Sequence, residues 1–234
     1  MADGIVLESF GGMNRICELI SRGMTRCPGD GFFVGVSKTL SIEPDARKYY
    51  LAYEQALSTI DQESWETLQE KAIAHFIDHR EGQQKQGFFN QLNDAFAYEY
   101  LIKEGCKDVR VLREGKGIQS DIEYTKNSEK CFCEVKTMGI SDAEIEWRAA
   151  SRVNPQVRSS FQELFGGFLR KLKSALDTAG RQIKARGGTG LIYIVVHFDD
   201  IAFDDYWDRC HEQILGMVFK THLPQPIDLN GHQR

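Results

Sequence analysis

The sequence predicts an α/β fold in which a mixed central sheet is flanked by helices, with an extra, mostly helical N-terminal part. Three observations predict it. An amphipathic helical pattern covers residues 88–104, and three short strand patterns follow it within residues 109–137. A basic amphipathic helix over 167–185 then precedes a continuous apolar strand at 191–198. Helices that alternate with strands in this way are typical of a sheet covered on both sides.

We expect two parts along the chain, with a boundary near residue 85. Residues 1–85 form the N-terminal part, whose role the sequence does not indicate, and residues 86–234 form the α/β core. Within the first part, Asp61 is placed to cap a helix. The apolar stripe of that helix consists of Trp65, Leu68, Ala72 and Phe76.

The strands of the core differ in character. Residues 109–112 predict a short strand, and 118–124 and 130–137 predict a pair joined by the polar stretch 125–129, as in a hairpin. The run at 191–198 is apolar at nearly every position, which indicates a strand buried on both faces in the middle of a sheet.

Charge is distributed unevenly along the 234 residues. The formal net charge is −5, yet residues 148–186 hold nine basic and two acidic side chains, a net +7 that leaves −12 elsewhere. Such a basic face suits contact with phosphates, although a solvated helix face explains it equally well. No apolar run is long enough to span a bilayer and no signal peptide is evident, so we expect a cytoplasmic protein without membrane contact.

The six cysteines show no CxxC pair and no regular framework. In a reducing compartment they are expected to be free thiols. Cys131 and Cys133 are two residues apart and should face the same side of a strand as small buried side chains. Zinc ligation by Cys210, His211 and His222 fits no common spacing.

Two carboxylates and a lysine fall on the predicted hairpin. Glu134 and Lys136 share one face of their strand, and pairing across the turn would bring Asp121 near Glu134. Carboxylate oxygens hold hard divalent cations such as Mg²⁺. A cation and a neighbouring ammonium can together stabilise the charge that develops on a phosphate under attack by water. The residues therefore predict hydrolysis of a phosphodiester.

This pattern resembles the PD-(D/E)XK nuclease superfamily, which has the restriction-endonuclease-like fold. Asp121 matches the first acidic position, Glu134 the second and Lys136 the lysine, while Ser120 stands where the family has proline. The order helix, three strands, helix, strand over residues 88–198 also matches. The resemblance implies a nuclease that uses Mg²⁺, or Mn²⁺ as a substitute, and it favours DNA over RNA and endonucleolytic cleavage.

Other residues are weaker candidates. Glu99 falls on the apolar stripe of helix 88–104, and family members often place a glutamate there, so we assign it as an auxiliary metal ligand. A buried salt bridge would explain Glu99 as well. Gln182 is favoured as a surface polar residue and His197 as a structural one, and Glu123 is either an extra ligand or a solvated strand residue.

The partner expected from this resemblance is nucleic acid, with DNA favoured. The basic residues that we expect to contact its phosphates are Arg170, Lys171, Lys173, Arg181 and Lys184. A homodimer is left open. Two alternatives remain: an inactive nuclease-fold module that binds nucleic acid or a protein partner, and an α/β protein in which the site residues form ordinary ion pairs. Sequence fingerprints of P-loop, dinucleotide-binding and serine-hydrolase enzymes are absent.

Overall fold

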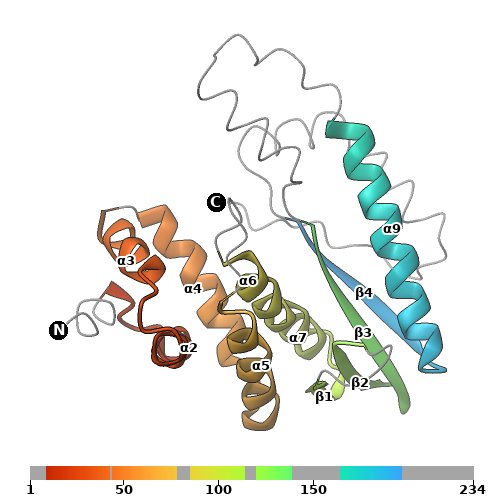
Figure 1. Ribbon diagram of the computed structural model, residues 1–234. Coiled ribbons are helices and arrows are strands. Elements are labelled where there is room, and N and C mark those ends of the chain that lie inside the picture. The colour runs from red at the N-terminus through yellow and green to blue at the C-terminus, as the bar shows by residue number, and fades with distance from the viewer. Residues whose placement is uncertain (1–8, 43, 78–84, 114–119, 139–163, 197–234) are drawn as a thin grey trace. The chain divides into compact units, whose positions relative to one another are not determined.

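The computed structural model describes residues 9–42, 44–77, 85–113, 120–138 and 164–196. It is a mixed α/β structure with a four-stranded mixed sheet flanked by helices, as predicted. Figure 1 shows its elements. The helices are α2 (Asn14–Arg26), α3 (Phe32–Ile42), α4 (Pro44–Ser58), α5 (Gln62–Ala74), α6 (Gln86–Leu92), α7 (Asp94–Lys103) and α9 (Leu164–Ala185). The strands are β1 (Lys107–Val111), β2 (Ile122–Lys126), β3 (Glu129–Met138) and β4 (Thr189–Val196).

The chain divides into two compact units. One comprises Met1–Lys136 with Ala179–Tyr193, and the other comprises Thr137–Thr178 with Ile194–Arg234. All the contacts among candidate catalytic residues described below lie within the first unit.

The sheet has the order β1-β2-β3-β4. β1 pairs with β2, and β2 with β3, in antiparallel fashion. Because the sheet as a whole is mixed, β4 runs parallel to β3. β4 approaches closely at Gly190, where an added Cβ would lie 2.1 Å from the backbone oxygen of Phe132. Only glycine permits this contact.

The β2–β3 hairpin has the shortest standard connection. Asn127 and Ser128 both adopt positive φ angles, 53° and 65°, as a two-residue hairpin turn of type I′ requires. The turn fixes a register in which Ile122 lies opposite Cys133. The expected hairpin is therefore confirmed, with a tighter turn than the polar stretch 125–129 suggested.

Helices on both sides of the predicted boundary near residue 85 share one hydrophobic core. Buried side chains of α2 to α5 belong to the same cluster as those of α6, α7 and β1 to β3. An aromatic group at its centre includes Phe33, Phe76 and Phe88, with the Phe33 and Phe76 rings stacked at 5.7 Å. The division of the chain near residue 85 stays a prediction about its organisation.

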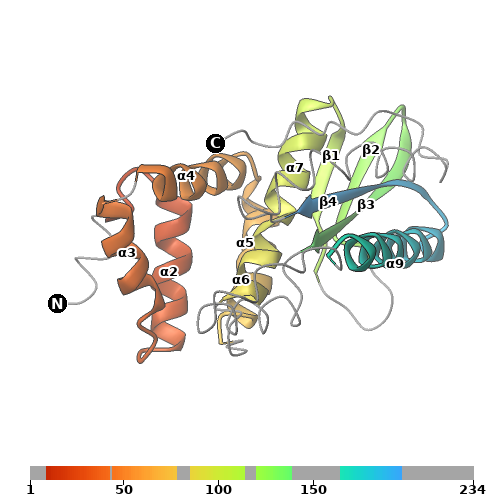
Figure 2. The same cartoon turned by 90° about the horizontal axis from the view of Figure 1, so that it is seen from above.

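Helix α5 is fixed at its start and tied to the sheet. The Asp61 carboxylate accepts a hydrogen bond from the Ser64 backbone N–H at 3.0 Å, so the predicted cap is confirmed. The Ser64 hydroxyl oxygen in turn accepts from the Val111 N–H of β1 at 3.1 Å. Figure 2 shows α5 and α7 together on one side of β1 and β2.

The helix predicted over 88–104 is divided into α6 and α7 at Asn93. The Asn93 side-chain oxygen accepts a hydrogen bond from the Tyr53 hydroxyl at 2.8 Å, inside the core. This tertiary contact accompanies the break, which the apolar periodicity did not reveal. Ile102, which helical spacing from Glu99 puts on the same apolar stripe, is 44% exposed.

Other expectations have simple outcomes. Cys131 and Cys133 are both buried on the core side of β3, as predicted, and the described cysteines are free thiols. His197, Cys210 and His222 lie outside the described residues. No helix within the described ranges is long and apolar enough to cross a membrane.

Candidate active site

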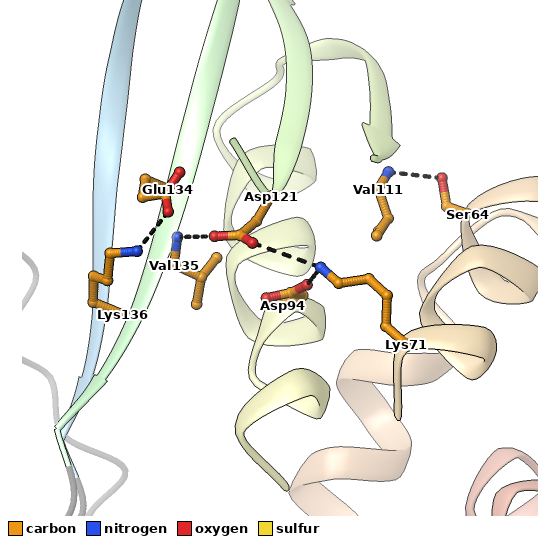
Figure 3. A network of polar contacts seen from close by, with 8 residues as sticks. All are labelled: Ser64, Lys71, Asp94, Val111, Asp121, Glu134, Val135 and Lys136. Atoms are coloured by element: carbon orange, nitrogen blue, oxygen red, sulfur yellow. Dashed lines mark hydrogen bonds and ion pairs between the residues drawn. The ribbon is translucent and has the colours of Figure 1, made fainter. Parts of the chain in front are cut away.

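The hairpin holds Asp121 opposite Glu134. Asp121 directly precedes β2, and its backbone N–H donates to the Cys133 carbonyl at 3.2 Å. One carboxylate oxygen, Oδ2, accepts from the Val135 backbone N–H at 2.8 Å. Figure 3 shows the Asp121 carboxylate directed at β3 between Val135 and the helices. The backbone and the carboxylate of Asp121 are thus each held by a hydrogen bond to the backbone of β3.

Glu134 and Lys136 lie on the same face of β3, as strand periodicity predicted. The Lys136 Nζ lies 2.5 Å from Oε1 of Glu134. The Glu134 side chain is 1% exposed, and its second oxygen, Oε2, has no hydrogen-bond partner within the described residues. Lys136 is 24% exposed, so its ammonium is the more accessible of the two groups. A buried carboxylate oxygen without a donor is unfavourable, and it is free to accept a hydrogen bond or to bind a cation.

The electrostatics of Glu134 follow from this crowding. Burial, followed by the negative charge of Asp121, raises its pKa to about 7, while Lys136 opposes the rise and Asp94 adds to it. Ionisation of Glu134 beside Asp121 is therefore disfavoured, even though Lys136 lies next to it. A cation between the acids would remove this penalty.

Two further residues join the cluster. Lys71 of α5 places its Nζ 2.6 Å from Oδ2 of Asp94 on α7 and 3.6 Å from Oδ1 of Asp121. Figure 3 shows this ammonium directed at both carboxylates, with a dashed line to each. Sequence reasoning missed both residues. Two signals were available: Lys71 adjoins the apolar stripe of α5, and Asp94 adjoins Ala95, which is buried. In the structure Asp94 itself is 3% exposed.

Glu99 contacts other residues. Its Oε1 accepts from the Gln55 amide at 3.3 Å and pairs with the Lys103 ammonium at 2.8 Å. Asp94 and Glu99 are five residues apart on one helix, which separates them by about 140° around its axis. The acid of α7 that contacts Lys71 is therefore Asp94, whereas the auxiliary metal-ligand role assigned to Glu99 stays a prediction beside its salt bridge with Lys103.

Three other residues noted in the sequence are Glu123, Gln182 and Ser120. Glu123 pairs with Lys130 at 2.7 Å, on the neighbouring strand. Gln182 lies half-buried on α9. The Ser120 hydroxyl, which precedes the site acid, is buried and makes no hydrogen bond within the described residues.

Helix α9 is amphipathic, with a basic exposed face. Its buried residues Leu172, Leu176, Ala179 and Ile183 follow helical spacing. The exposed residues include all five of the predicted phosphate contacts, Arg170, Lys171, Lys173, Arg181 and Lys184. Just after the helix, the Arg186 guanidinium lies 5.9 Å from the ring centre of Phe132, a residue on the Glu134 face of β3.

The site offers only a few protein ligands to a divalent cation, within the described residues. In the described ranges, no three His, Cys, Asp or Glu side chains form a group that could hold a metal. Asp121 and the free Oε2 of Glu134 offer two carboxylates, and Mg²⁺ commonly takes only one or two from the protein, with water and substrate phosphate completing its shell. The residues therefore fit Mg²⁺ better than a cation whose coordination shell consists mainly of protein ligands.

Comparisons with models of known protein families, with curated proteins and with solved structures found no match to this chain.

Proposed function

We propose that this protein is a Mg²⁺-dependent nuclease of the PD-(D/E)XK type, with the restriction-endonuclease-like fold and with DNA as its substrate. One observation carries the proposal: buried Glu134 presents an unpaired oxygen beside Asp121, while Lys136 contacts its other oxygen at 2.5 Å. The order of elements along the chain, α7, β1, β2, β3, α9 and β4, is the order on which the resemblance rests. Endonucleolytic cleavage is the favoured mode.

Each residue has a defined role. Asp121 and Glu134 would hold Mg²⁺, which when bound supplies a Lewis acid that polarises the scissile phosphate. The Val135 N–H keeps Asp121 oriented, and the rigid β3 backbone fixes the spacing between Glu134 and Lys136. The Lys136 ammonium orients the attacking water or stabilises the negative charge that develops on the phosphate oxygens.

The proposal predicts that cleavage depends on a divalent cation. Purified protein is expected to cut circular and linear DNA with Mg²⁺ or Mn²⁺, and to be inactive in excess EDTA. Ca²⁺ should support little cleavage, because its looser coordination positions the reacting groups poorly. Nicking of a circular plasmid, followed on a gel, reports endonucleolytic cuts directly. Cleavage in EDTA at the Mg²⁺ rate would contradict the proposal, and tight binding without any cleavage would favour the inactive nucleic-acid-binding module.

The basic face of α9 is proposed to contact the phosphate backbone. Replacing Arg170, Lys171 and Lys173 together by glutamine should weaken DNA binding and lower the slope of log K against log salt by roughly 2 to 3, since each lost contact releases about one counterion fewer. Fluorescence anisotropy over a salt series measures both quantities. A triple glutamine variant at Arg26, Lys38 and Lys48 of α2 to α4 is the matched control. Equal slopes for the two triple variants would remove α9 from the interface.

A further inference from the structure

Lys71 is a buried lysine whose ammonium lies among the acids of the candidate site. Its side chain is 6% exposed, and it comes from α5, a helix that precedes the α7-to-β4 core in the chain. Burying an ammonium is unfavourable unless opposite charges compensate it. Asp94 and Asp121 provide that compensation.

The two contacts of this ammonium are unequal. Its Nζ lies 2.6 Å from Asp94, a short charge-assisted hydrogen bond, but 3.6 Å from Asp121. Lys71 can therefore give up Asp121 while Asp94 continues to compensate its charge. The Ser64–Val111 hydrogen bond fixes α5 against β1, so the ammonium is held in place from outside the hairpin.

Asp121 is also one of the two proposed metal ligands. A cation that binds its carboxylate must share it with Lys71 or displace Lys71 from it. We infer that Lys71 is an internal counter-cation that stabilises the metal-free site and competes with the divalent cation for Asp121. This inference rests on the proposed metal-dependent function. It gives the N-terminal helix α5 a role in setting the metal affinity, because Lys71 of this helix acts as a positioning residue.

The competition has a clear signature in Mn²⁺ binding. Lys71→Met removes the competing charge, so Mn²⁺ should bind about tenfold more tightly, an order-of-magnitude expectation for one charge at this distance. Titration followed by electron paramagnetic resonance measures the dissociation constant without any turnover. In EDTA the same variant should melt at a lower temperature than the parent, because Asp94 and Asp121 lose their shared cation.

Three variants make the test specific. Lys71→Gln removes the charge while its amide still donates to Asp94, and it decides the matter if Lys71→Met fails to fold. Asp94→Asn should weaken Mn²⁺ binding, because Lys71 then loses its 2.6 Å contact with the Asp94 carboxylate and interacts more strongly with Asp121. Lys126→Met, which removes a 48% exposed ammonium paired with Glu104, is the matched control and should leave the affinity unchanged.

The outcomes separate this inference from the proposed function. If the parent binds no Mn²⁺, the proposed function and the competition both fail. If the parent binds Mn²⁺ and both Lys71 variants bind it equally or more weakly, the competition alone is overturned. Tighter binding by Asp94→Asn would overturn it as well. Opposite shifts in the Lys71 and Asp94 variants, with no change in Lys126→Met, support it.

Discussion

Lys136→Ala is expected to lower the DNA cleavage rate by about 10²- to 10⁴-fold at saturating Mg²⁺, the range typical of removing one positioned catalytic group. The ammonium is held within 2.5 Å of Glu134 and is more exposed than that carboxylate, so it is the cation available to a phosphate. Mn²⁺ binding should be kept or strengthened, since Glu134 loses a competing positive charge. Single-turnover cleavage and Mn²⁺ titration on the same preparation measure the two effects separately.

Lys130→Ala is the matched control for Lys136→Ala. Lys130 lies on the same strand with the same parity, but its ammonium is 62% exposed and pairs with Glu123. This variant should cleave within about twofold of the parent, because a surface ion pair contributes little. Cleavage by Lys136→Ala at the parent rate would remove Lys136 from the mechanism and favour the interpretation of these residues as ordinary ion pairs.

The hairpin portion of the site could be predicted because its geometry is local. Strand periodicity alone places Glu134 and Lys136 on one face, and a short turn is enough to bring Asp121 opposite Glu134. In the structure the Asp121 N–H donates to the Cys133 carbonyl and its carboxylate accepts from the Val135 N–H. These contacts depend on register, which the turn at residues 127 and 128 sets.

The helical portion could not be predicted in the same way. The Lys71–Asp94 contact joins residues 23 apart on separate helices, and no local pattern encodes the angle between those helices. Glu99 was favoured because residues 88–104 predict one helix with one buried stripe. In the structure α4 packs against α7, and Glu99 is buried beside Gln55. Its burial was thus correctly inferred, whereas no local pattern indicated the contact with Gln55.

The pKa of Glu134 predicts a large effect of pH on stability. This pKa is about 7 in the folded protein, mainly because of burial, against 4.5 for an unperturbed glutamate. Between these values the folded state keeps a proton that the unfolded state has lost. Raising the pH through this window therefore favours unfolding, and the contribution is complete below pH 4.5 and lost above pH 7. The shift corresponds to roughly 3 kcal/mol of unfolding free energy.

Glu134→Gln should abolish this loss, because an amide has no charge to bury. In EDTA, the urea-derived free energy of unfolding of the parent is expected to fall between pH 5 and pH 8 by up to about 3 kcal/mol more than that of the variant. Glu123→Gln, which changes a more exposed glutamate on the adjacent strand, is the control and should follow the parent. Saturating Mn²⁺ should reduce the parent's loss at pH 8, since a bound cation favours the ionised carboxylate. Parallel pH profiles for the parent and Glu134→Gln would show that Glu134 is already ionised at pH 5. The unfavourable burial of its charge would then no longer support a cation site beside it.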